Sequence, residues 1–357
     1  MSRVARRIAM TRLGGVPEGL LGRPPAVAWP TQDEGALLGA SEADREAFDT
    51  TPRARAARHA RAMLRRMEPV VMLSPRWSAT ERFIDDLAQD LAVGEPTVAC
   101  RVVTFRVVVG RSPVECWRQT LQVLARLGEG GRRRRSPRTV ADRRGFRWAL
   151  DELLDEVHEH ALHRTALLAH GCEQLPVEVL GDLVGAWRDY RDRYPDERRC
   201  TALFSAADTS PWLALGDRPP FTLSDYAETE ALAAIVGRAG PMPLRGLERA
   251  ARFTGGIPAL VEKLADVTRV RGSLPSRPAE LLEAFGALGE ELRGAVEIAN
   301  AHEQLAERLG ALLDGEPQPL NEAVDRALIS AGLLRPLRTA KGPQVALRAP
   351  AIAAYIG

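Results

Sequence analysis

The chain has 357 residues, which exceeds the usual size of one domain, so we expect two or three units that each bury a core. Hydrophobic residues make up 45% and aromatic residues only 5%, a balance that favours helical and α/β packing over β-sandwiches. The net charge of +2 is too small to imply nucleic-acid binding by itself. Because no apolar segment is long enough to span a membrane and no signal-peptide pattern occurs, we expect a cytoplasmic protein without membrane contact.

The first 220 residues or so divide into an N-terminal extension and an α/β core. Residues 1–55 contain scattered Gly, Pro and charged residues without a sustained period, which is typical of an extension. In residues 56–225, short apolar runs alternate with amphipathic helical patterns, which predicts a parallel sheet covered by helices on both faces. Strands are expected at 69–73, 98–109, 165–169 and 201–206, with a fifth candidate at 220–223.

Strands disappear from the pattern after about residue 225. We expect a helical lid over 226–271 and a linker containing Ser and Pro up to residue 277. The remaining unit, 278–357, is expected to hold three helices and then a hairpin, an order that is typical of a winged helix. The helices are predicted at about 279–299, 303–313 and 320–331, and the hairpin at 335–348 with Gly342 and Pro343 in its turn.

Three motifs follow one another as they do in one group of P-loop ATPases. Leu175-Pro176 is similar to the end of that group's Walker B segment. The run Phe253-Thr254-Gly255-Gly256-Ile257-Pro258-Ala259-Leu260 resembles its lid signature TGGxPxxL, and residues 325–334 resemble the third helix and turn of its winged helix. About residues 60–357 thus resemble the AAA+/STAND superfamily, in its Orc/Cdc6-like or transposition-ATPase-like branch. The resemblance implies an AAA+-like core, a lid with Thr254, Gly255, Gly256 and Pro258 as its motif, and a winged helix.

The segment after the first strand departs from the phosphate-binding pattern GxxxxGK[ST]. In that pattern glycines let backbone N–H groups close on the phosphates, lysine contacts the terminal phosphates, and Ser or Thr holds Mg²⁺. The resemblance places Ser74 and Ala79 at the two glycines, Thr80 at the lysine and Glu81 at the Mg²⁺ hydroxyl. Glu81 matters most, because a carboxylate at a helix N-terminus occupies the positive end that would attract a phosphate.

The Walker B position has also lost its carboxylates. Where the family has Asp for Mg²⁺ and Glu for the attacking water, this chain has His170 and Gly171, and Glu173 comes two residues late. We therefore expect no cofactor and no metal, and we interpret the protein as a catalytically inactive pseudo-ATPase that serves protein partners as a scaffold or regulatory subunit. Two alternatives stay open: a divergent active ATPase in which an arginine, such as Arg76, replaces the lysine, and a winged-helix DNA-binding regulator.

An arginine-rich segment is the strongest charge feature of the sequence. Such a run can contact DNA or RNA phosphates without sequence specificity, dock an acidic protein face, or form a solvated loop. Its first members are Arg132, Arg133, Arg134, Arg135 and Arg138, followed by Arg143, Arg144 and Arg147. Arg338 and Lys341 of the predicted hairpin are further candidates for nucleic-acid contact.

Overall fold

The computed structural model describes residues 51–94, 98–105, 112–124, 140–160, 163–207, 221–275 and 277–356. The N-terminal extension up to residue 50 therefore lies outside the described residues, as does the end of the second predicted strand beyond residue 105. In the described ranges, none of the helices combines the length and the hydropathy that a membrane crossing requires.

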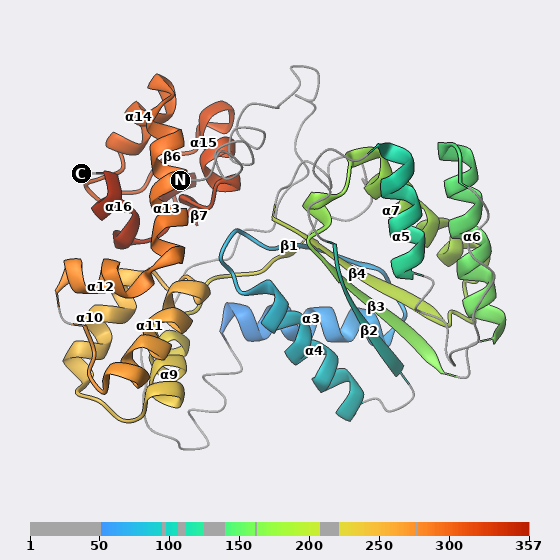
Figure 1. The fold of residues 1–357 in the computed structure, drawn as a ribbon, viewed down its shortest axis with the longest axis horizontal. Coiled ribbons are helices and arrows are strands. Elements are labelled where there is room, and N and C mark those ends of the chain that lie inside the picture. Colours follow the sequence, from blue (N-terminus) through green and yellow to red (C-terminus); the bar gives the residue numbers. More distant parts are fainter. Residues whose placement is uncertain are drawn as a thin grey trace.

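A five-stranded parallel sheet, with strands between Val70 and Thr222, organises the first part of the chain (Figure 1). Every strand pairing in it is parallel, which confirms the predicted α/β class. The two central strands are almost wholly buried because helices cover both faces of the sheet. In spatial order the strands are β2 (Val98–Thr104), β3 (Arg164–His170), β4 (Cys200–Ala206), β1 (Val70–Leu73) and β5 (Phe221–Thr222).

Two groups of helices cover the sheet, one on each face (Figure 1). Side chains alternate along a strand, so neighbouring residues enter different cores: Leu167 packs with one group of helices and Leu168 with the other. The Leu168 side is covered by α3 (Pro52–Arg65) and α4 (Thr80–Gly94). The Leu167 side is covered by α5 (Pro113–Leu124), α6 (Arg143–His160) and α7 (Val177–Arg193). The short 3₁₀-helix η2 (Cys172–Gln174) joins β3 to α7.

Helices dominate the rest of the chain, which ends in a small antiparallel sheet of the order β6-β8-β7. The lid helices are α9 (Glu228–Ala239), α10 (Leu244–Thr254) and α11 (Pro258–Arg271). The C-terminal elements are α12 (Pro278–Phe285), α13 (Ala287–Asn300), α14 (Glu303–Gly310), β6 (Gln318–Pro319), α15 (Glu322–Ser330), β7 (Leu334–Thr339), β8 (Gly342–Leu347) and α16 (Pro350–Ile356).

The C-terminal unit differs from the expectation in three details. The helix predicted at 279–299 is two helices, because Gly286 has a φ of 52° and interrupts the helical path. The hairpin turn consists of Ala340 and Lys341, while Gly342 already opens β8. Strand β6 and helix α16 were not predicted, since both are short and carry little periodicity.

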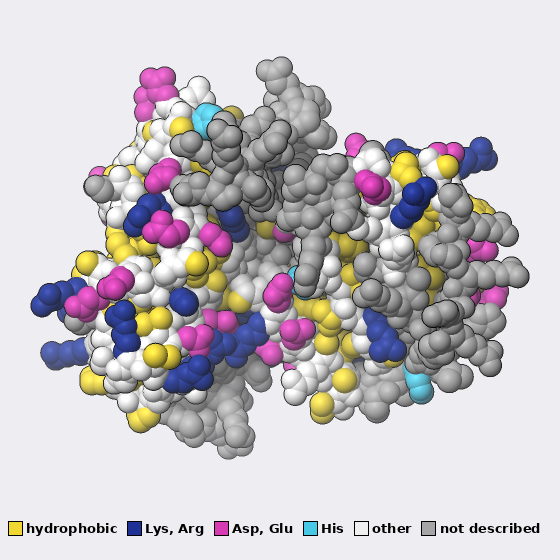
Figure 2. All heavy atoms as spheres, viewed as in Figure 1, with side chains coloured by type: hydrophobic (Ala, Val, Ile, Leu, Met, Phe, Trp, Pro, Cys, Tyr) yellow, Lys and Arg dark blue, Asp and Glu magenta, His cyan; other side chains and the backbone are white. Residues whose placement is uncertain are grey.

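One hydrophobic core unites the lid with the C-terminal unit. Ile257 and Leu260 of the lid pack in the same cluster as Phe285 of α12 and Leu333 beside β7. Gly272 and Ser273, between α11 and α12, are exposed, but Leu274 packs against this core. Basic and acidic side chains are interspersed over the described part of the face shown in Figure 2. The lid and the C-terminal unit are thus joined by apolar packing beneath a surface of mixed charge.

A buried ion pair ties strand β6 to α14 and α15, the helices on either side of it in the chain. Asp325 on α15 is fully buried and receives both Nε and Nη2 of Arg308 at 2.7 and 2.8 Å. The same carboxylate accepts the Asn321 backbone N–H at 2.7 Å, and Arg308 also donates to the carbonyl of Pro319. A bidentate pair with further hydrogen bonds is the arrangement in which a buried charge is compensated.

Replacing Asp325 with Ala is expected to lower the free energy of unfolding by about 3 kcal/mol, because the Arg308 guanidinium loses its partner in an interior site. Urea denaturation measures the loss. Asp192→Ala is the control: it breaks an exposed pair with Arg191, in which the Asp192 side chain is 61% exposed. That change should cost less than about 1 kcal/mol, and equal losses in the two variants would contradict the argument.

Candidate functional site

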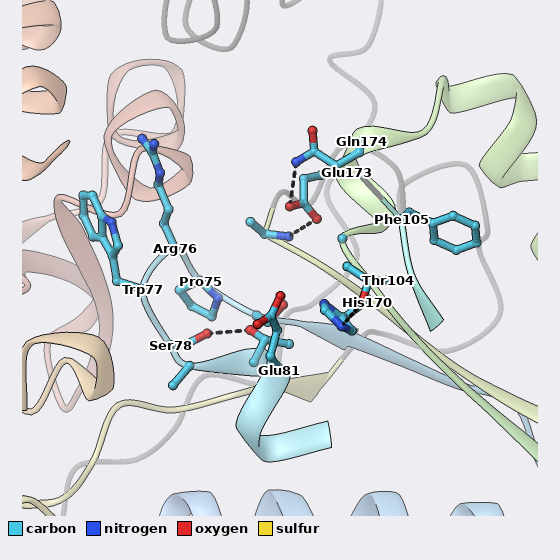
Figure 3. A pocket seen from close by; sticks show the side chains of 15 residues that line it. Pro75, Arg76, Trp77, Ser78, Glu81, Thr104, Phe105, His170, Glu173 and Gln174 are labelled. Atoms are coloured by element: carbon cyan, nitrogen blue, oxygen red, sulfur yellow. Dashed lines mark hydrogen bonds between the residues drawn. The ribbon is translucent and has the colours of Figure 1, made fainter. Parts of the chain in front are cut away.

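A cavity of about 460 Å³ lies at the carboxyl ends of β1, β2, β3 and β4 (Figure 3). This edge of a parallel sheet is where open α/β folds bind ligands. All seven residues predicted for the degenerate nucleotide site line the cavity, so the structure brings them together: Ser74, Arg76, Ala79, Thr80, Glu81, His170 and Gly171. The lining also includes Thr104, Phe105, Glu173, Gln174 and Ala207.

The loop between β1 and α4 occupies the place of a phosphate-binding loop and has a strained backbone. Trp77 and Ala79 have φ angles of 63° and 50°, a region that costs a residue with a Cβ atom about 1 kcal/mol or more. The resemblance places Ala79 at a glycine of the ATPase pattern, and Ala79 adopts the left-handed conformation that glycine favours. Such strain survives only where surrounding contacts hold the backbone in place.

Three donors from outside the loop hold its backbone carbonyls. Arg53 of α3 donates to the carbonyl of Ser78 at 3.0 Å, and the Ala259 N–H at the start of α11 donates to that of Trp77 at 3.0 Å. Arg348, which follows β8, donates to the carbonyl of Arg76. The loop is therefore hydrogen-bonded to α3, to the lid and to the residue that follows the C-terminal hairpin.

Arg348 carries the C-terminal part of this arrangement. Its side chain is 2% exposed and makes a bidentate ion pair with Asp225, with Nε 2.8 Å from Oδ2 and Nη2 2.5 Å from Oδ1. Trp77 packs against the core shared by the lid and the C-terminal unit. Gly332 permits this contact, because a Cβ there would lie 2.9 Å from the Trp77 ring.

The predicted lid motif forms part of the same junction and does not line the cavity. Gly255 and Gly256 have φ angles of 61° and 75°, and a Cβ on either would lie 2.2 Å from a backbone carbonyl, that of Arg348 or that of Tyr226. Thr254 is fully buried and its hydroxyl accepts the Gly256 N–H at 3.3 Å. Pro258 begins α11. The motif therefore serves close packing between the lid and the hairpin end.

Glu81 lies in the first turn of α4, at the cavity, and its side chain is exposed. Its carboxylate makes no hydrogen bond or ion pair with another described residue. Helix α4 is 15 residues long, so its N-terminus carries a partial positive charge that this carboxylate partly neutralises. A phosphate group at this place would meet a negative charge.

His170 ends β3 and forms another part of the cavity wall (Figure 3). It is 6% exposed, and its Nε2 lies 2.7 Å from the Thr104 hydroxyl. Burial lowers the pKa of His170 below its ordinary value of 6.5, although Glu81, Asp85 and Glu173 act in the opposite direction. The imidazole is therefore neutral at pH 7. Gly171 follows it with a φ of 74°, and a Cβ there would lie 2.5 Å from the carbonyl oxygen of Phe105.

Glu173 lines the cavity even though it comes two residues after the expected position. Its carboxylate accepts the Ala207 N–H at 3.2 Å and the Gln174 amide at 3.1 Å. Thr104 and Phe105 were missed in the sequence because no motif marks them. The available signal is topological: the carboxyl ends of neighbouring parallel strands, here β2 and β3, meet at one edge.

The candidate nucleic-acid contacts fall only partly within the described residues. Arg132, Arg133, Arg134, Arg135 and Arg138 lie outside the described residues. The later arginines belong to α6, where Arg143 makes a bidentate pair with Asp182 at 2.7 and 2.9 Å and Arg147 pairs with Asp189. Arg338 lies on β7, and Lys341 is exposed in the hairpin turn. Two of the arginines in α6 are thus already neutralised by α7.

No protein-family model and no curated protein matches the chain. Among solved structures, the Walker-type ATPase PABY2304 of Pyrococcus abyssi aligns with a TM-score of 0.55 at 12% identity, over 87% of this chain and 96% of that chain. Cdc6p from Pyrobaculum aerophilum aligns with a TM-score of 0.45 at 12% identity, over 85% of this chain and 93% of that chain. The STAND protein PH0952 from Pyrococcus horikoshii, with a tetratricopeptide repeat sensor, reaches 0.40 at 12% identity, over 86% of this chain and 42% of that chain.

These identities are low enough that the similarity shows the fold alone. The fold is AAA+-like: a parallel sheet of the order 2-3-4-1-5, a helical region and a small C-terminal antiparallel sheet. The expected fold class is confirmed.

Replacing Arg348 with Met should loosen the junction, because it leaves Asp225 unpaired and the Arg76 carbonyl without its donor. We expect the free energy of unfolding to fall by about 3 kcal/mol. Hydrogen exchange read by mass spectrometry should become faster at 74–80 and 257–260 but not in α7. Uniform acceleration along the chain would show that the effect is global rather than confined to the junction.

The lowered pKa of His170 predicts a dependence of stability on pH. The folded state resists protonation of this imidazole, so its contribution is fully present above pH 6.5 and is lost as the pH falls below that value. His170→Gln should flatten the decline of the free energy of unfolding between pH 6.5 and 5, measured by urea titration. His158, whose pKa burial also lowers, retains its share of the decline. An unchanged slope in His170→Gln would contradict the prediction; His163→Gln, on the exposed His163, is the matched control.

Proposed function

We propose that this protein is a catalytically inactive AAA+-like pseudo-ATPase that acts as a scaffold or regulatory subunit for protein partners. The observation that carries the proposal is the Glu81 carboxylate at the start of α4, which lines the cavity and makes no hydrogen bond or ion pair with another described residue. No lysine stands among the described residues that line this cavity. A triphosphate would therefore meet a carboxylate where the ATPase pattern has a hydroxyl and a lysine beside it.

The hydrolytic side of the site supports the same proposal. A neutral His170 stands at the end of β3, where ATPases of this fold class would carry a carboxylate for Mg²⁺. Imidazole nitrogen is a poor substitute for the oxygen ligands that Mg²⁺ prefers. The remaining carboxylate, Glu173, accepts the Ala207 backbone N–H after β4 and the side-chain amide of Gln174 in η2.

The divergent active ATPase requires an arginine, such as Arg76, to replace the missing lysine. In Figure 3 the Arg76 side chain extends away from Glu81 and His170. Its guanidinium carbon lies 5.1 Å from the centre of the Trp77 ring, a cation–π arrangement. This orientation favours the inactive interpretation over the active one.

The scaffold role is supported by the way the loop is held. Its carbonyls accept hydrogen bonds from α3, from the lid and from the residue after β8, so protein contacts fix the relative placement of these parts. We therefore expect protein partners to bind this fixed arrangement of core, lid and C-terminal unit. Contact with DNA or RNA through the arginine-rich segment stays a prediction.

Purified protein is expected to show no ATP hydrolysis and no rise in melting temperature with Mg·ATP, because a ligand specific for the folded state must stabilise it. The double variant Thr80→Lys/Glu81→Ser restores the lysine and removes the carboxylate, and should gain a measurable shift. A clear shift in the wild-type protein that Arg76→Ala abolishes would favour the active ATPase instead.

A further inference from the structure

The cavity has an acidic half that none of the nucleotide-site motifs explains. Figure 3 shows the Glu81 and Glu173 side chains directed into the same space, with His170 beside Glu81. Arg76 is the single Arg or Lys among the described lining residues, and it turns toward Trp77. Among the described lining residues, two carboxylates thus face this half of the cavity and no cationic side chain lies between them.

The groups around the carboxylates include hydroxyls, from Ser74, Ser78, Thr80 and Thr104, and two groups that can act as acceptors. His170 is nine-tenths buried, and its Nδ1 makes no hydrogen bond with another described residue. When Nε2 donates to the Thr104 hydroxyl, Nδ1 is left as an acceptor. Gln174 donates its amide to Glu173, which leaves its carbonyl oxygen as an acceptor. A ligand held by Glu81 and Glu173 would supply hydrogen-bond donors and positive charge.

A metal ion suits these residues poorly. The described residues contain no group of three His, Cys, Asp or Glu side chains placed to hold one. A cavity of about 460 Å³ is also far larger than a single ion needs and falls within the usual range for small organic ligands. A guanidinium presents five N–H donors in one plane and an ammonium presents three, so either can satisfy several separated acceptors.

We propose that this cavity binds a small organic cation, a guanidinium or primary ammonium group, between Glu81 and Glu173. The inference rests on the proposed loss of ATP binding, since Mg·ATP would occupy the same cavity. Glu81 supplies an exposed carboxylate at the edge, and Glu173 supplies a carboxylate held in place by Ala207 and Gln174. The cation comes either from a free small molecule or from an arginine side chain of a protein.

The test is a titration of the full-length protein, by calorimetry and by thermal shift, with two probes. Agmatine represents the free cation, and N-acetyl-arginine amide represents an arginine within a protein. N-acetyl-citrulline amide is the neutral control of nearly the same shape. We expect a shift with at least one cation and none with citrulline; tighter binding of agmatine points to the free molecule, and tighter binding of the arginine amide points to a protein side chain.

Glu81→Gln should weaken cation binding about tenfold, because it removes one charge-assisted hydrogen bond. Glu173→Gln in addition should abolish binding. Glu178→Gln is the matched control: Glu178 is likewise an exposed residue in the first turn of a helix, but it does not line the cavity. Glu81 is exposed and makes no hydrogen bond or ion pair with another described residue. Glu81→Gln therefore tests the site without destabilising the fold.

Failure of this inference can be told apart from failure of the proposed function. Binding of Mg·ATP by the wild-type protein overturns the proposed function, whatever the cations do. No response to either cation, together with no response to Mg·ATP, leaves the pseudo-ATPase intact and overturns the cation site. Equal cation affinities in wild type, Glu81→Gln and Glu178→Gln also overturn it.

Discussion

The ion pair between Arg348 and Asp225 is the contact on which the arrangement of this protein depends. Asp225 follows the last strand of the large sheet, and Arg348 follows the last strand of the small one. The same guanidinium bonds to the loop that leaves β1. Because a buried guanidinium needs a carboxylate partner, this pair fixes the ends of the two sheets and the β1–α4 loop relative to one another. Gly255 matters for the same reason, since any side chain there would strike the Arg348 carbonyl.

The character of the cavity follows from this junction. Two non-glycine residues of the loop adopt left-handed conformations, and Arg53, Ala259 and Arg348 hold the carbonyls that such a path exposes. A loop held by three partners has little freedom to adapt to a ligand. A ligand must therefore match the shape and charge already present, and near Glu81 that charge is negative. The inactive interpretation and the cation site thus share one physical origin.

The positions of the strands in the large sheet could be predicted from the sequence, because the signal for a buried strand is local. Buried parallel strands are short apolar runs, and the helices between them show one apolar face each. The C-terminal unit was predicted less well. Gly286 divides a helix whose apolar period continues across it, and the turn belongs to Ala340 and Lys341 because Gly342 pairs with Thr339 at the first rung of the hairpin. Periodicity does not register such single-residue breaks.

The sequence by itself determined the order of the elements and the departure of residues 74–81 from the phosphate-loop pattern, because both are written in neighbouring residues. Only the tertiary structure decided which distant groups meet there. Arg348 lies 272 positions from the Arg76 carbonyl that it bonds and 123 positions from Asp225. Glu173 and Thr104 join the cavity through the pairing of parallel strands, at a distance along the chain that no local pattern encodes. Period and charge are local properties, whereas the partners of a buried charge are chosen by the packing of the whole chain.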